Sequence, residues 1–182
     1  MSLQELQKKL PEIRAWIDHT LAAHVAAARP VSAFGFPRLG SYYSIDLLAT
    51  ARAVPIAAVP RPPLASMGLA GFDEFENMEA DGITYLSSYF VRRDHERVES
   101  LHFHELVHVV QWQKLGPELF IMAYALGHLL SGGYLTNPLE KQAYGLQARF
   151  DRNDPPFDVA SLVKLEVDRI AQELLRSAQA LQ

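Results

Sequence analysis

The chain has 182 residues, of which 49% are hydrophobic and 21% are charged. This balance is typical of a globular domain that is long enough to bury a hydrophobic core. The net charge of −4 gives no electrostatic reason to expect nucleic acid or an anionic membrane as a partner. The chain contains no cysteine, which excludes disulfides and thiolate metal sites. Any metal site must therefore be built from histidine and carboxylate side chains.

The sequence contains no internal repeat and no clear targeting segment. The N-terminus lacks the apolar core of a signal peptide, and the longest apolar run, residues 119–130, is too short to span a bilayer. We therefore expect a cytoplasmic protein with a single domain over residues 1–182. Within it we expect an N-terminal portion of helix and edge strand over 1–80, a core over 82–150 and a C-terminal helix over 151–182.

The sequence of residues 1–80 predicts one long helix followed by irregular structure. Residues 3–28 carry a helical stripe of apolar residues, and Pro11 should kink this helix or divide it in two. A short helix is expected near residues 42–49. Residues 51–59 suggest a strand, whose prolines favour an edge position or interrupted pairing. The acidic stretch before Gly82 is expected to be a solvated loop with about one helical turn.

The clearest strand pattern is ITYLSSYFV at residues 83–91. Its side chains alternate between two faces, with Ile83, Tyr85 and Tyr89 on one and Thr84 on the other. The pattern ends one short loop before the helix that carries the candidate site. We therefore expect a single strand beside the site, with a free edge that could pair with an extended peptide.

The pattern that most strongly indicates function is HExxH, formed by His104, Glu105 and His108. It lies in residues 98–113, which contain no Gly or Pro and predict a buried helix. At 3.6 residues per turn the two histidines stand one above the other, in the register that binds one metal ion. Glu105 lies about 100° round the helix, where it could take a proton from a metal-activated water. The alternative is that the histidines are hydrogen-bonded core residues and that Glu105 pairs with an arginine.

A catalytic zinc ion usually has three protein ligands, so a third must be found. The extended motif HExxHxxGxxH is excluded because positions 111 and 114 hold Gln and Lys. Glu140 is the favoured candidate. Asn137 and Pro138 predict the start of a helix, which places Glu140 in its first turn. A capping box at this helix start would also explain a glutamate at position 140. Glu118 is expected only to favour the dipole of its helix, and His128, in an apolar helix, is more typical of a core residue.

The segments HELVHVVQW and NPLEKQAY, with the ITY strand before the first histidine, resemble small bacterial zincin-like proteins of the gluzincin group. The resemblance covers roughly residues 82–150. It implies a mainly helical α+β fold of the zincin type, with a small sheet packed against the HExxH helix. It also implies His104, His108 and Glu140 as ligands of one Zn²⁺ ion and Glu105 as the general base. Many gluzincins place an aspartate four residues after the ligand glutamate, and here that position is Tyr144.

Further residues are candidates for supporting roles. Gln111, one turn beyond His108, could hydrogen-bond a ligand or the substrate, or be an ordinary core-rim glutamine. Tyr124, Tyr134 and Tyr144 are candidates for a phenol that stabilises a developing oxyanion, although buried tyrosines are more often packing residues.

The leading hypothesis is a zinc-dependent hydrolase, specifically a metallopeptidase acting on a peptide or protein. The alternatives are a zincin-like domain that binds metal or peptide without turnover, and a metal-free helical domain with core histidines. The sequence predicts neither the substrate nor the oligomeric state.

Overall fold

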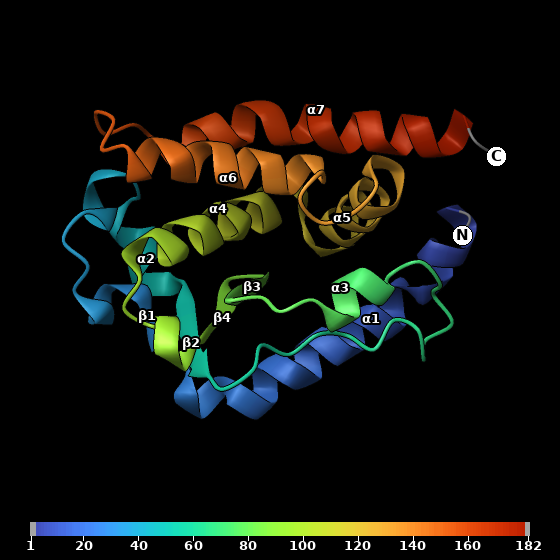
Figure 1. The fold of residues 1–182 in the computed structure, drawn as a ribbon, viewed down its shortest axis with the longest axis horizontal. Coiled ribbons are helices and arrows are strands. Elements are labelled where there is room, and N and C mark those ends of the chain that lie inside the picture. The colour runs from blue at the N-terminus through green and yellow to red at the C-terminus, as the bar shows by residue number, and fades with distance from the viewer. Residues whose placement is uncertain (1–2, 181–182) are drawn as a thin grey trace.

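A four-stranded mixed sheet lies between helical layers in the computed structural model, which describes residues 3–180 (Figure 1). The strands are β1 (Arg29–Pro30), β2 (Arg52–Ile56), β3 (Gly82–Tyr85) and β4 (Ser88–Arg92). Their order in the sheet is β1-β2-β4-β3, with β2 and β4 parallel and the other two pairs antiparallel. Strand β3 is therefore an edge strand.

Helices cover both faces of this sheet. Helix α4 (Glu99–Leu115) packs on one face, and α1 (Leu3–His24) lies against the other, where the ring of Trp16 contacts Tyr85. Helices α6 (Pro138–Asp151) and α7 (Val159–Ala180) cover the side of α4 that faces away from the sheet (Figure 1). The remaining helical elements are α5 (Pro117–Ser131), the short α2 (Ile45–Thr50) and α3 (Asp73–Asn77), and the 3₁₀ turns Val25–Ala27, Val31–Phe34, Leu39–Ser41 and Arg93–His95. The fold is thus α+β and mainly helical, with the small sheet packed against α4, as predicted.

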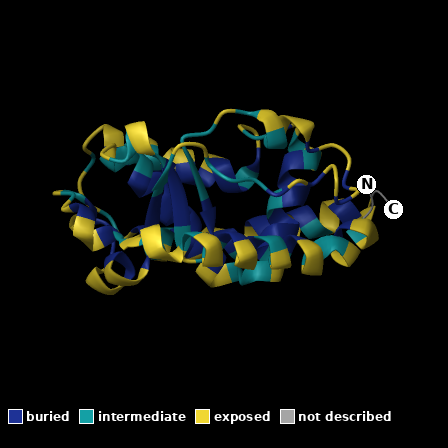
Figure 2. Cartoon of the chain, turned by 90° about the horizontal axis from the view of Figure 1, so that it is seen from below, coloured by how far each residue is buried: buried dark blue, intermediate teal, exposed yellow. Residues whose placement is uncertain are grey.

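Helix α4 is the centre of the core. Every residue from His102 to Trp112 is buried, so the helix has no solvent-facing stripe over three turns. A helix that is apolar on all faces is stable only when neighbours cover all of them, and here the sheet, α6 and α7 do so. Figure 2 shows this arrangement, with buried residues in the middle layers and exposed ones on the outer faces. The helix ends at Leu115, the following residue Gly116 has a φ of 75° that favours glycine, and Pro117 begins α5.

The single strand predicted over residues 83–91 is wrong, because this segment forms a hairpin. The chain reverses after Tyr85, with Leu86 at a φ of 59°, and Thr84 pairs with Tyr89. Paired residues share a face, so Thr84 and Tyr89 both face α4, whereas one continuous strand would have put them on opposite faces. No glycine marks this turn, and the apolar pattern continues through it, which is why the sequence did not reveal it.

The other predictions for the N-terminal portion are partly confirmed. Helix α1 contains Pro11 but continues to His24 without division, and the last predicted residues form a 3₁₀ turn. Strand β2 is not an edge strand, since it lies between β1 and β4. Its pairing with β1 stops at Ala53, so Pro55 meets no strand on that side, and the prediction of interrupted pairing is confirmed.

The C-terminal helix is shorter than predicted. It begins at Val159, and the chain from 152 to 158 is a turn and an extended segment rather than helix. Residues 181 and 182, which the prediction included, lie outside the described residues, as do residues 1 and 2. Within residues 3–180, none of the helices combines the length and the apolar character that crossing a membrane requires.

Candidate metal site

The side chains of His104, His108 and Glu140 converge at the centre of the molecule. The two Nε2 atoms are 3.1 Å apart, and Glu140 Oε2 lies 3.3 Å from that of His104 and 3.4 Å from that of His108. All three residues are buried. Tetrahedral ligands at a zinc distance of about 2.0–2.1 Å stand about 3.3–3.4 Å from one another, so the spacing suits one ion. The structure thus brings together the three residues that were predicted as ligands.

Hydrogen bonds to the other ring nitrogens determine which atoms point inward. His108 Nδ1 lies 2.8 Å from Gln111 Oε1, and the Gln111 amide nitrogen donates to the Leu139 carbonyl and to Gln142. Since a carbonyl only accepts, the amide oxygen must face His108, and Nδ1 must carry the hydrogen. His104 Nδ1 has the same contact with Gln147 Oε1 at 2.9 Å. With Nδ1 engaged in this way on both rings, both histidines direct Nε2 toward Glu140.

This arrangement requires a positive charge at its centre. Two lone pairs and a carboxylate oxygen face one another, and Glu140 Oε2 is buried without a hydrogen-bond partner among the described residues. Burial alone would lower the pKa of His108, but the Glu140 carboxylate outweighs it and raises that pKa to about 9. Burial would likewise raise the pKa of Glu140, and His108 and His104 instead hold it below its usual value. Either a proton or a metal ion satisfies the cluster, and the three-ligand geometry fits the metal.

Helix α6 places Glu140 through its N-terminal cap. Asn137 is completely buried; its Oδ1 accepts from the Leu139 backbone N–H, and its Nδ2 donates to the Tyr124 carbonyl of α5. A Cβ on Gly127 would lie 2.4 Å from Asn137 Oδ1, so only glycine allows this approach of the two helices. The first turn of α6 is thereby fixed against α5. Glu140 at the third helical position then faces α4.

Glu105 occupies a separate position beside the metal ligands. Its Oε2 accepts a hydrogen bond of 2.6 Å from Thr84 Oγ1, on edge strand β3. Burial raises the pKa of the Glu105 carboxyl above its ordinary value, while His104, His108 and the bond from Thr84 oppose that rise. Glu105 is thus a buried carboxyl group with a raised pKa, held beside but not among the three candidate metal ligands.

The close approach of β3 makes Gly82 a sensitive position. A Cβ there would lie 2.3 Å from Glu105 Oε1 and 2.8 Å from Cδ, so Gly82→Ala must displace the carboxylate. A displacement of about 1 Å can cost about 10²-fold in rate, and we expect a loss of that order in any hydrolytic activity with zinc content unchanged. Steady-state kinetics beside elemental analysis measures both. Gly40→Ala is the matched control because a Cβ there meets nothing within 4 Å; a Gly82→Ala variant as active as wild type would contradict the prediction.

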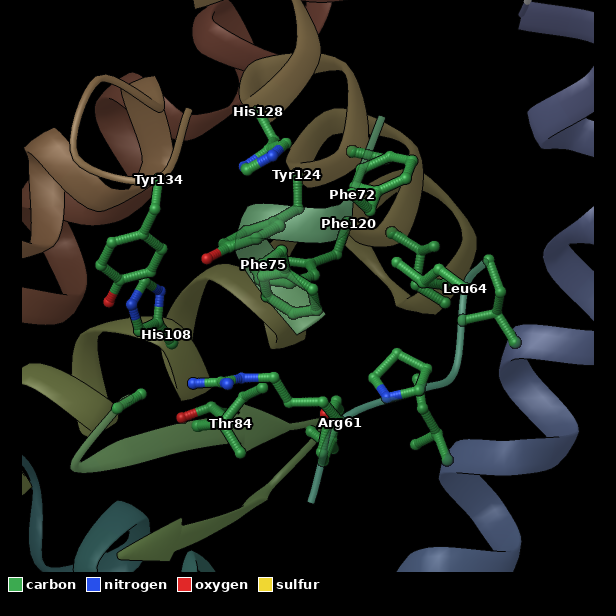
Figure 3. A pocket seen from close by; sticks show the side chains of 18 of the residues that line it. Arg61, Leu64, Phe72, Phe75, Thr84, His108, Phe120, Tyr124, His128 and Tyr134 are labelled. Carbon is green, nitrogen blue, oxygen red and sulfur yellow. The ribbon is translucent and has the colours of Figure 1, made fainter. Parts of the chain in front are cut away.

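The three candidate tyrosines have different surroundings. The Tyr124 hydroxyl donates to Glu140 Oε1 at 2.6 Å and is committed to the ligand glutamate. The Tyr144 ring lies against His104, with 4.5 Å between the ring centres, and the residue is 40% exposed. The Tyr134 hydroxyl has one described partner, the Tyr144 hydroxyl at 3.4 Å, and lines the pocket next to His108 (Figure 3).

The two other acid or histidine candidates lie away from the metal ligands. Glu118 is exposed in the first turn of α5. His128 is buried but stacks on Phe72, with 5.4 Å between ring centres, and does not join the three convergent residues. A core histidine of the kind that the alternative hypothesis required does occur on α4, at His102. Tyr89 and the Glu96 carbonyl occupy both its nitrogens, and burial lowers its pKa to about 4.

The sequence analysis missed three residues that support the site. Thr84 binds Glu105, Gln147 binds His104, and Gln142 fixes the orientation of Gln111. One signal was available for Gln147, which lies seven residues after Glu140 and therefore on the same helix face. Thr84 and Gln142 have no such signal, because their roles depend on how β3 and α6 pack against α4.

A pocket of about 100 Å³ extends from this site toward helix α1 (Figure 3). Glu105 and the candidate ligands His108 and Glu140 line it, and so do Leu6 and Ile17 of α1. Comparison of the chain with protein-family models, with curated proteins and with solved structures gives no significant match. The function must therefore be argued from the site itself.

Proposed function

We propose that this protein is a zinc-dependent hydrolase, and specifically a metallopeptidase of the gluzincin type. The observation that carries the proposal is the convergence of His104, His108 and Glu140, with both histidine lone pairs directed inward. Two histidines and one glutamate are a ligand set of catalytic zinc sites that leave a fourth position open. The adjoining pocket supplies a place for a substrate next to that position.

The chain's own residues supply the steps that move protons. Zinc held by the three ligands would lower the pKa of a bound water and polarise the scissile carbonyl. Glu105 accepts the proton of the attacking water and later delivers it to the leaving amine. Thr84 holds Glu105 through Oε2 and orients it, because its hydroxyl donates to that oxygen. Tyr134 is the tyrosine best placed to donate to the oxyanion, since Tyr124 is already bound to Glu140.

Strand β3 offers a surface for the peptide backbone. The Arg92 N–H bonds to the Asp81 carbonyl across the hairpin, so by the alternation of antiparallel pairs Gly82 and Thr84 direct their backbone groups away from β4. The Thr84 carbonyl is taken by Trp112 Nε1 at 3.1 Å. Within residues 3–180 the backbone groups of Gly82 and the Thr84 N–H have no hydrogen-bond partner, and we propose that an extended peptide pairs with them by β-augmentation.

Metal content and cleavage together test this function. Protein purified without a metal-binding tag should contain stoichiometric zinc, and a peptide library should show cleavage that a chelator stops and added zinc restores. Zinc without cleavage of any peptide would favour a metal-binding domain that performs no turnover. Protein that contains and binds no metal would refute the proposal and support the metal-free alternative.

A further inference from the structure

Arg61 is a cation that lines the pocket and has no role in the proposed reaction. It belongs to the connection between β2 and α3, and its guanidinium extends toward Thr84 and His108 (Figure 3). Nη1 donates to the carbonyls of Glu76 and Met78, and the group lies 5.8 Å from the centre of the Phe75 ring. Nη2 is buried and has no hydrogen-bond partner among the described residues. One side of the guanidinium is thus anchored by backbone carbonyls, and the other side has no hydrogen-bond partner among residues 3–180.

No carboxylate of the described chain neutralises this cation. None of the ion pairs within residues 3–180 includes Arg61. The nearby Glu76 carboxylate accepts from the Ala65 backbone N–H instead. Burial lowers the pKa of Arg61, which reflects the cost of keeping the charge in this pocket. A partly buried guanidinium whose Nη2 is buried without a partner is stabilised most by a carboxylate, which matches its planar geometry.

The charges around the metal site also favour one anion. Glu105 and Glu140 contribute two negative charges to the pocket lining, and a zinc ion would balance both. Arg61 is the one Lys or Arg among the described lining residues, so it leaves a single positive charge. A ligand with one negative group would therefore neutralise the pocket, whereas an uncharged peptide segment would leave Arg61 unpaired.

The rest of the pocket is shaped for an apolar side chain. Its walls include Leu64, Phe72, Phe75, Phe120 and Ile121. A cavity of about 150 Å³ holds benzene, so the pocket volume of about 100 Å³ suits a leucine or valine side chain better than tryptophan. A carboxylate and an apolar side chain occur on the same residue at a peptide C-terminus. An internal Asp or Glu would bring the charge without the apolar group.

We infer that Arg61 binds the C-terminal carboxylate of the substrate while the apolar side chain of that terminal residue fills the pocket, so that the enzyme is a carboxypeptidase. This inference rests on the proposed function. The water oxygen bonds to the carbonyl carbon of the last peptide bond, and the C–N bond breaks. The terminal amino acid leaves with the proton that Glu105 delivers to its nitrogen, and the remaining peptide keeps the new carboxylate.

Paired peptides that differ only at the C-terminus test the inference. Wild type should release leucine from a peptide ending in free Leu, and the C-terminal amide should be cleaved about 10–100-fold less efficiently, the range for one charge-assisted hydrogen bond. Arg61→Gln should lose most of the preference for the free acid, measured as the ratio of cleavage efficiencies for the acid and the amide. Arg61→Lys should keep part of this preference. Arg97→Gln is the matched control. Like Arg61, Arg97 donates to a backbone carbonyl, that of Phe34, and its guanidinium lies over a phenylalanine ring, that of Phe36. The control should leave the ratio unchanged.

A binding assay separates this inference from the proposed turnover. N-acetyl-leucine and N-acetyl-leucinamide are titrated into zinc-loaded Glu105→Gln protein and its Arg61→Gln derivative, with NMR as the readout. Tighter binding of the acid, lost with Arg61, supports the inference even if no peptide is cleaved. Equal binding of acid and amide overturns it, whatever the peptidase activity. Cleavage that follows an internal Asp or Glu, irrespective of the C-terminus, would also overturn the carboxypeptidase assignment.

Discussion

Glu105→Gln is expected to reduce hydrolysis by about 10²–10⁴-fold, the contribution of a positioned general base, while zinc content stays stoichiometric. Glutamine has nearly the same size as glutamate, and its amide oxygen can still accept the bond from Thr84 Oγ1. What the substitution removes is the group that takes the proton from water. Because His104, His108 and Glu140 remain in place, the metal should bind as in wild type. The measurement is kcat on the best library substrate, with zinc determined on the same sample.

Glu118→Gln provides the control for this change. Glu118 is an exposed glutamate on the neighbouring helix, so its replacement makes the same chemical change without touching the site. It should leave both kcat and zinc content unaltered. If Glu105→Gln retained wild-type kcat, Glu105 would not be the base, and the proposed proton route would have to be abandoned.

His104→Ala is expected to abolish the stabilisation of the protein by zinc. A ligand at about 1,000 times its Kd adds about 4 kcal/mol to the free energy of unfolding. For a chain of this size that corresponds to a rise in Tm of about 10 °C. The variant lacks one of the three candidate ligands and removes the ring that contacts Gln147 Oε1 and Glu140 Oε2, so its Tm should not respond to zinc. Thermal unfolding in chelator and in excess zinc measures the effect.

His102→Gln is the appropriate comparison for that experiment. His102 is a buried histidine on the same helix, but Tyr89 and the Glu96 carbonyl occupy its nitrogens. Its replacement should lower Tm in chelator through lost hydrogen bonds, yet preserve the rise that zinc produces. A rise of equal size in His104→Ala and wild type would exclude His104 as a ligand.

The part of the site that could be predicted from the sequence is the part set by helix geometry. His104 and His108 share a face because they are four residues apart, and Asn137 with Pro138 determines where α6 begins. Glu140 was identified because a first-turn residue of that helix could reach the metal if the helices packed together. These inferences needed only the spacing of residues along a single helix.

The residues that escaped prediction depend on contacts between elements. Thr84 contacts Glu105 because β3 packs against α4, and the reversal at Leu86, through which the apolar pattern passes unbroken, brings Tyr89 to the same face. Gln147 became informative only once its contact with His104 was known, whereas Gln111 was already a candidate and only the orientation of its amide depended on the packing of α6. Arg61 belongs with these residues, since no local pattern indicates that an arginine will point into a pocket formed by distant helices.

Because β2 and β4 are parallel, a long connection must follow β2 before the chain returns to the sheet. The candidate metal ligands and part of the pocket lining therefore come from different stretches of the chain. All three candidate metal ligands come from residues 104–140, on two helices that are close in sequence and can associate early in folding. The connection from β2 crosses to β3 over residues 57–81 and carries Arg61 and Phe75 into the pocket. Substitutions in this connection can therefore alter which molecules are accepted without disturbing the ligands of the ion. Such modularity would let selection change specificity in one stretch while the chemistry in the other is retained.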